Sequence, residues 1–167
     1  MAELTTQERL QPSLLDRLTD DEPSTTVESR EKRVISATRL RDCVSRDMSW
    51  LLNCVNLGTD EDLDEYPEVA RSVLNFGIPD LTGMAMSGID VHALQRQVRE
   101  AILAFEPRLT ASTLHVTVNA DGKRMDRKSL VFSIESEMWA QPIPLNLYLK
   151  TEVDLETGKF NVSESFG

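Results

Sequence analysis

The chain has 167 residues, a length that fits one domain of ordinary size. Its 28 acidic and 18 basic side chains give a formal net charge of -10, which would repel the phosphates of a nucleic acid and an anionic membrane surface. No apolar run reaches the length of a membrane span, and the start lacks the basic and apolar regions of a signal peptide. We therefore expect a cytoplasmic protein that does not bind nucleic acid and does not insert directly into a membrane.

Residues 1–29 are rich in Thr, Ser, Glu, Asp and Pro, a composition that favours a flexible segment. Within them, Leu14, Leu15 and Leu18 follow Ser13 with a spacing that predicts a short helical turn carrying a leucine stripe. Two interpretations remain open for this turn. It packs on the chain's own core, or it docks on a partner.

Residues 30–167 are expected to form the folded domain. Apolar residues recur at helical spacing between Ser29 and Asn53, which predicts a long amphipathic helix that ends near Asn56 and Gly58. Cys43 and Cys54 would then lie on one helix, roughly 16 Å apart at a rise of 1.5 Å per residue, too far for a disulfide. We expect both to be buried thiols, because the chain has no recognised metal-ligand spacing.

The next two segments interrupt the periodic pattern. Residues 59–68 contain six acidic side chains around Tyr66 and Pro67, which is typical of a solvated loop and lacks the glycine and ligand spacing of a calcium loop. Residues 72–83 mix apolar residues with Gly77, Pro79 and Gly83, which predicts a tightly packed irregular connection.

A second helix follows. Ser87 and Asp90 have the spacing of a capping box, and Pro107 is expected to stop the helix. Its apolar stripe consists of Leu94, Val98, Ala101, Ile102 and Phe105.

From residue 114 onward the apolar period changes to two, as in half-buried strands. Turns are predicted at Asp121-Gly122 and at Thr157-Gly158-Lys159. The inward-facing residues are predicted to be Leu114, Val116 and Val118; Leu130, Phe132, Ile134 and Met138; Leu145, Leu147, Leu149, Thr151, Val153 and Leu155; and Phe160 with Val162. These patterns predict an α+β fold, with two main helices packed on one face of a small three- or four-stranded antiparallel sheet.

Few residues suggest catalysis. Glu106 with Glu135 or Glu137 could supply an acid–base pair, but the sequence does not bring them into one cleft. No nucleophile motif or phosphate-binding glycine loop occurs, and His115 is expected to be solvated on a strand. We expect no cofactor.

The sharpest local motif is Glu106-Pro107-Arg108, where the second helix meets the sheet. Proline disfavours helical geometry at the residue before it, and residues two apart in an extended segment face the same side, so Glu106 and Arg108 should point together. One interpretation is a helix stop flanked by two solvated charges. The other is an acid and a guanidinium displayed to a partner.

Three ordered blocks resemble the TssE family of type VI secretion baseplate subunits, which is similar to the baseplate wedge protein of contractile-tail phages. They are Pro12 to Leu18, Ser72 to Leu81, and Glu106-Pro107-Arg108. The resemblance implies a scaffold rather than an enzyme, with the tripeptide as its functional signature. It also implies the wedge proteins TssF and TssG, the adaptor TssK and the sheath proteins TssB and TssC as partners.

Two other functions remain as alternatives. A peptidoglycan hydrolase is suggested by Glu106, as the catalytic carboxylate, and by the lysozyme-like label that the phage relatives have carried. An acidic adaptor would bind a basic partner through residues 60–68. Under the scaffold interpretation, we expect the strand at residues 145–155 to be a sheet edge that pairs with a strand of the sheath.

Overall fold

The computed structural model describes residues 13–19, 23–24, 36–85, 88–119, 129–138 and 145–164, apart from the side chains of Arg17 and Glu164. The main helices are α2 (Ala37–Leu52) and α4 (Val91–Phe105), and the strands are β1 (His115–Asn119), β2 (Ser129–Met138), β3 (Leu145–Asp154) and β4 (Phe160–Glu164). Short elements are α1 (Leu14–Leu18), η3 (Leu57–Thr59), α3 (Pro67–Ala70) and η4 (Val73–Asn75). The predicted α+β class is confirmed.

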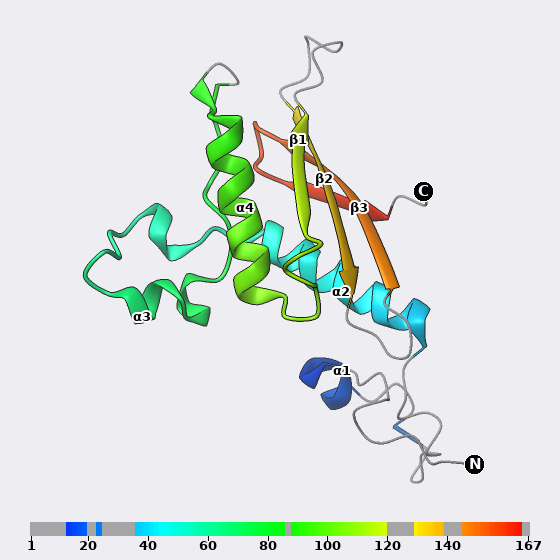
Figure 1. Cartoon of the computed structure of the whole chain (residues 1–167). Helices are drawn as coiled ribbons and strands as arrows, with labels where there is room; N and C mark the ends of the chain where they lie inside the picture. Colours follow the sequence, from blue (N-terminus) through cyan, green and yellow to red (C-terminus); the bar gives the residue numbers. More distant parts are fainter. Residues whose placement is uncertain are drawn as a thin grey trace.

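The four strands form one antiparallel sheet in the order β1-β2-β3-β4. In Figure 1, α4 runs beside β1, and α2 crosses the sheet near the lower ends of β2 and β3 in this view. The predicted strand parity is confirmed. Along β2 and β3 every second side chain is buried, from Leu130 to Met138 and from Leu147 to Val153. The two helices cover this apolar face.

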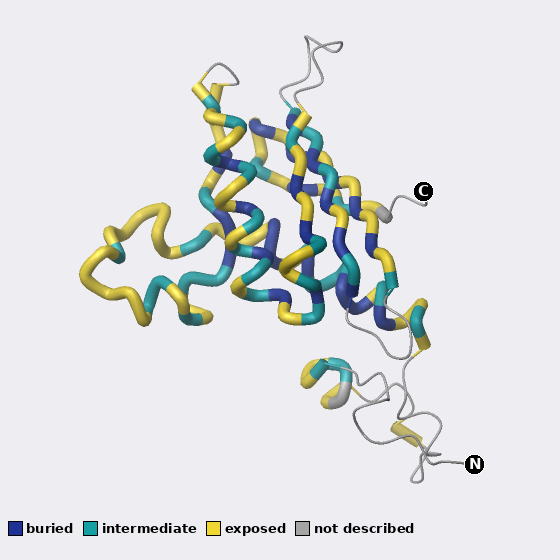
Figure 2. Tube along the Cα trace, viewed as in Figure 1, coloured by how far each residue is buried: buried dark blue, intermediate teal, exposed yellow. Residues whose placement is uncertain are grey.

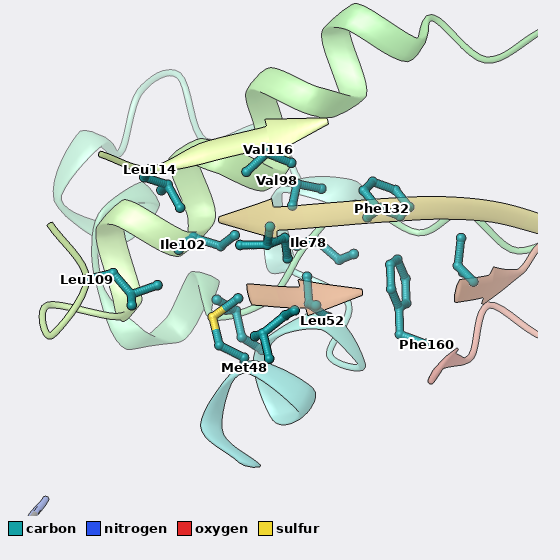
Figure 3. Close-up of a cluster of buried hydrophobic side chains, with 14 of the residues drawn as sticks. Met48, Leu52, Ile78, Val98, Ile102, Leu109, Leu114, Val116, Phe132 and Phe160 are labelled. Carbon is teal, nitrogen blue, oxygen red and sulfur yellow. The ribbon is translucent and has the colours of Figure 1, made fainter. Parts of the chain in front are cut away.

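The core joins that face to the apolar stripes of both helices. Met48 and Leu52 come from α2, and Val98 and Ile102 from α4; Figure 3 shows these side chains with those of the sheet. All four are at most 2% exposed. The predicted stripe of α4 is confirmed, with Leu94, Val98 and Ile102 buried and Ala101 and Phe105 packed against them.

Helix boundaries differ from the prediction in three places, at the end of α2, at the start of α4 and at the start of α2. The C-cap of α2 is Asn53 rather than a residue near Asn56 or Gly58. Its amide Nδ2 donates to the Ser49 and Phe160 carbonyls at 2.8 and 3.1 Å, and its Oδ1 accepts from the Phe160 N–H at 3.0 Å. Asn53 therefore ties the end of α2 to β4, a long-range contact that helical periodicity does not encode.

The start of α4 is the second difference. Asp90 is its N-cap and accepts from the backbone N–H groups of His92 and Ala93, both at 3.0 Å. The predicted capping box, with Ser87 as the cap, was wrong about where the helix begins. The predicted stop is confirmed, because α4 ends at Phe105, two residues before Pro107.

Cysteine placement also needs a correction. Cys43 is buried in α2, as predicted, but Cys54 lies beyond the end of the helix and is exposed. Its backbone, rather than its thiol, is structural: the Cys54 carbonyl accepts from the Ile78 N–H at 3.0 Å.

The prediction that residues 145–155 form a sheet edge was wrong. β3 is an interior strand, paired with β2 along its full length and with β4 from Leu149 to Val153. The edges of the described sheet are β1 and β4.

The predicted start of the first long helix near Ser29 was wrong, because Ser36 is the extended N-cap of α2, which begins at Ala37. Two predictions fall outside the described residues: the turn at Asp121-Gly122 and most of the segment 1–29. The turn at Thr157-Gly158-Lys159 and the exposure of His115 are confirmed. The irregular course of residues 72–83 is confirmed as well. Its tight packing holds for Ile78 and Leu81, which are buried, but was wrong for Val73 and Leu74, which are exposed. No described helix is long and apolar enough to cross a membrane.

Candidate functional site: the turn after α4 and its ion-pair chain

The turn after α4 places the two charged side chains of the Glu-Pro-Arg motif together, as the extended geometry predicts. Glu106 is the C-cap, with φ -121° and ψ 79°, and its N–H donates to the Ile102 carbonyl at 2.8 Å. Pro107 is exposed, Arg108 is partly buried, and Glu106 is only 3% exposed. The interpretation of two solvated charges was therefore wrong for Glu106, which lies inside the fold.

Arg108 neutralises the buried carboxylate through a bidentate contact. Its Nε donates to Glu106 Oε1 at 2.7 Å, and its Nη2 donates to Oε2 at 2.5 Å. The Arg108 backbone N–H donates to Oε1 as well, at 3.1 Å. Both carboxylate oxygens are thus occupied, in the fork geometry that makes arginine–carboxylate pairs strong.

A second carboxylate reaches the same guanidinium from α2. Asp47 Oδ2 accepts from Arg108 Nη2 at 2.5 Å, which joins residues 61 positions apart. Burial alone would lower the pKa of Arg108, but its hydrogen bonds and charge interactions with Glu106 and Asp47 raise the pKa above its ordinary value. The guanidinium therefore stays charged and pins the turn to α2.

The chain of ion pairs continues to α1. Arg46 donates through Nε to Asp47 Oδ1 at 2.9 Å, and through Nη1 to Asp16 Oδ1 at 2.7 Å. Asp16 accepts at its other oxygen from the Ser13 hydroxyl at 2.5 Å. Glu106, Arg108, Asp47, Arg46 and Asp16 thus form one alternating chain of charges across three segments.

The Asp16 end of the chain is well shielded, with a side chain 5% exposed. Burial would raise the pKa of Asp16, but hydrogen bonds from Arg46, Ser13 and Cys43 outweigh that effect and hold the pKa well below its usual range. The pKa of the Cys43 thiol is raised by burial and by its hydrogen bond to Asp16. Asp16 is therefore an anion that fastens α1 to α2.

The three predicted leucines project from the same short helix. Leu14 and Leu18 are 71% and 74% exposed, and Leu15 is 44% exposed. The interpretation that they pack on the chain's own core was wrong. Asp16 attaches the helix while the leucine side chains face solvent.

The Glu-Pro-Arg turn and the leucine-bearing helix α1 are thus connected through Arg46 and Asp47, which sequence reasoning did not select. Arg46 and Asp47 are polar positions of an amphipathic helix, which by themselves suggest only a solvated face. The one local signal was at Asp16, which lies three residues after Ser13, the spacing of a helix cap whose hydroxyl accepts from the Asp16 N–H at 3.3 Å.

This arrangement suits packing and recognition better than acid–base catalysis. Both oxygens of Glu106 are held by Arg108, and Glu135 is exposed on β2. A shallow depression beside α1 and the start of α2 is lined by Asp16, Ser36, Thr38, Arg39, Asp42, Cys43 and Arg46, without Glu106. Within the described ranges, no group of three His, Cys, Asp or Glu side chains could hold a metal ion.

Comparison with protein families gives one finding. Residues 38–143 match the family described as baseplate wedge protein gp25. The match covers more than half of the chain and includes α2 after its first residue, all of α4 and the Glu106–Arg108 turn. Comparison with curated proteins and with solved structures gives no match.

Proposed function

The chain belongs to the baseplate wedge protein gp25 family, and from this membership we propose that it is the TssE-type subunit of a type VI secretion baseplate. In this role it binds the wedge proteins TssF and TssG and the adaptor TssK, and it helps to start polymerisation of the TssB and TssC sheath in the cytoplasm. The family match, which contains the ion-paired Glu-Pro-Arg turn, is the observation that carries this proposal.

The Glu-Pro-Arg turn is proposed to be a partner contact with a division of labour. Pro107 is exposed and Arg108 is partly exposed, so these two residues form the surface that a wedge protein touches. Glu106 is a positioning residue, because its buried carboxylate fixes the Arg108 side chain. A rigid guanidinium loses less side-chain entropy on binding than a free one does.

The leucine face of α1 is proposed as a second contact. Leu14, Leu15 and Leu18 expose apolar surface on one helical turn, and Asp16 holds that turn in place through Arg46. Helix-in-groove recognition uses anchors with this spacing. Because α1 and the Glu-Pro-Arg turn share one ion-pair chain, binding at either surface would hold both in place.

Sheath initiation is proposed to use the β4 edge in place of the interior strand β3. The Asp154 N–H donates to the Lys159 carbonyl at 3.1 Å, so in the alternating antiparallel ladder Val153 and Phe160 face each other without exchanging hydrogen bonds. The N–H groups of Phe160 and Val162 therefore point away from β3. Asn53 occupies that of Phe160, which leaves Val162 at the open edge of the described sheet.

This geometry gives a selective test. Val162→Pro removes an outward N–H without removing a hydrogen bond of the β3·β4 ladder, whereas Val162→Ala shortens the same side chain and keeps the N–H. In cells that lack the native gene, we expect Val162→Ala to support assembly of fluorescently tagged TssB sheaths and Val162→Pro to reduce sheath number at least tenfold. Equal sheath numbers in the two strains would contradict strand addition at β4.

No catalytic activity is proposed. The hydrolase alternative requires a carboxyl group that can exchange a proton with substrate, whereas Glu106 is buried and paired with Arg108. Peptidoglycan turnover by the purified chain, lost in Glu106→Gln, would overturn this part of the proposal.

A further inference from the structure

Residues 55–76 form a projection, here called the 55–76 lobe, that contains η3, α3 and η4. Figure 1 shows it extending away from the sheet, to the left of the lower half of α4. None of its residues is buried, and Figure 2 accordingly shows it without dark blue. Its most exposed apolar residues are Val73 at 80%, Leu74 at 68% and Tyr66 at 58%.

The lobe is nevertheless well organised by hydrogen bonds. Asn75 accepts from the Gly58 N–H through Oδ1 and donates through Nδ2 to the Ala70 carbonyl, both at 2.9 Å. At its base, the Asn56 N–H donates to the Ile78 carbonyl at 3.0 Å, next to a parallel bridge between Val55 and Ile78. The chain thus holds Val73 and Leu74 in fixed positions, although neither contributes to its own core.

The base of the lobe explains why this order persists. Gly77 has φ 129°, a backbone conformation that residues other than glycine rarely adopt. A Cβ at this position would lie 2.4 Å from the Cys54 carbonyl oxygen. Phe76, beside it, packs edge to face on Phe105 of α4 with ring centroids 5.2 Å apart. Holding Val73 and Leu74 in place costs conformational entropy that the burial of their own side chains does not offset, as expected of residues that bind a partner.

The charge of the lobe restricts what that partner can be. All six acidic side chains of the lobe are exposed, and its only basic residue is Arg71, so the lobe carries half of the chain's formal net charge of -10. The acidic residues are Asp60, Glu61, Asp62, Asp64, Glu65 and Glu68. A second copy of the lobe or a nucleic acid would be repelled, whereas lysine and arginine side chains would be attracted.

We propose that the 55–76 lobe is a docking surface for a baseplate protein that presents an apolar groove bordered by lysine and arginine. Val73 and Leu74 enter the groove, and the acidic residues pair with its rim. The inference rests on the proposed baseplate function and adds a third contact, separate from the Glu-Pro-Arg turn and from α1. Apolar anchors at the centre provide affinity, and charges at the rim accelerate association.

The test measures binding of the full chain to a purified complex of TssF, TssG and TssK by biolayer interferometry. Leu74→Asp is expected to raise Kd at least tenfold, and Met84→Asp is the matched control, because Met84 is 41% exposed outside the lobe. The urea midpoints of both variants should equal that of the wild type, since neither side chain is buried.

A charge variant distinguishes the effect of the acidic residues on the association rate from the effect of the apolar residues on affinity. Replacing Asp60, Asp62 and Asp64 together by Asn should slow association at least threefold at 50 mM NaCl and have no effect at 500 mM, where charges are screened. Wild-type binding with an unchanged Kd for Leu74→Asp would overturn the lobe inference and leave the proposed function intact. Failure of the wild-type chain to bind the complex would overturn the proposed function itself.

Discussion

Replacing Arg108 with alanine should destabilise the fold as well as any partner contact. The substitution removes two side-chain hydrogen bonds from the Glu106 carboxylate, which is 3% exposed, and one from Asp47. Removing one partner of a buried ion pair typically costs about 3–5 kcal/mol, because the remaining charge is left in a poorly solvated site. The free energy of unfolding should therefore fall substantially.

The structure favours the lower end of that range. Glu106 Oε1 would still accept from the backbone N–H of residue 108 at 3.1 Å. Asp47 Oδ1 would keep its ion pair with Arg46 Nη2 at 2.8 Å. We expect a loss of about 3 kcal/mol. With an m-value of about 2 kcal/mol per molar urea, the unfolding midpoint should fall by roughly 1.5 M.

A double-mutant cycle in urea tests the physical cause. Adding Glu106→Gln to Arg108→Ala removes the unpaired charge and should recover about 2 kcal/mol, a coupling that only interacting residues show. Arg96→Ala, at an exposed position of α4, is the control and should change stability by less than about 0.5 kcal/mol. A shift for Arg108→Ala as small as that of the control would refute the reasoning, as would the absence of any recovery in the double variant.

Two further predictions concern α1 and the base of the lobe. The pKa of Asp16 is lowered in the folded chain, so its stabilising effect is complete above its unfolded pKa near 4 and declines as the pH falls below that value. Asp16→Asn should therefore reduce the free energy of unfolding by about 1 kcal/mol at pH 7 and by progressively less between pH 4 and pH 2. Urea titration at each pH measures this reduction, and a reduction independent of pH would contradict the prediction. Gly77→Ala should cost about 1–3 kcal/mol, because alanine is strained at this positive φ and its Cβ would overlap the Cys54 carbonyl. In the same titration Gly88→Ala should cost less than about 0.5 kcal/mol, because no atom of the described residues lies within 4 Å of the added Cβ. Equal effects of the two glycine substitutions would refute the strain argument.

The periodic elements were predictable because burial imposes their periods directly. The alternation from Leu130 to Met138 and the helical stripe from Leu94 to Ile102 follow from which side of each element faces the core. The proline stop of α4 was predictable for a similar reason, since it depends on one residue and its neighbours.

The ion-pair chain could not be predicted in the same way. Asp47 and Arg108 are 61 residues apart, and nothing in local sequence distinguishes them from solvated charges. Whether Glu106 is buried depends on how α2 approaches the turn, which is a property of the packed fold. The motif was therefore visible in the sequence, but the side chains that surround it were not.

Strand order was misjudged because period-2 alternation does not distinguish an interior strand from an edge strand. β3 is long and regular, which suggested a free edge, but β4 pairs with it from Leu149 to Val153. The prediction that Cys54 lies on the first long helix failed for a different reason. The α2 helix ends at Leu52, where Asn53 makes contact with Phe160, and a contact between residues 107 positions apart leaves no local signal.

The most direct test of the baseplate assignment is a pull-down of the tagged full chain from cells that express the whole secretion cluster, with captured proteins identified by mass spectrometry. We predict recovery of TssF, TssG and TssK, together with sheath proteins, at levels well above those captured by an unrelated acidic protein of similar size. Recovery of none of these proteins by a folded wild-type chain would contradict the account.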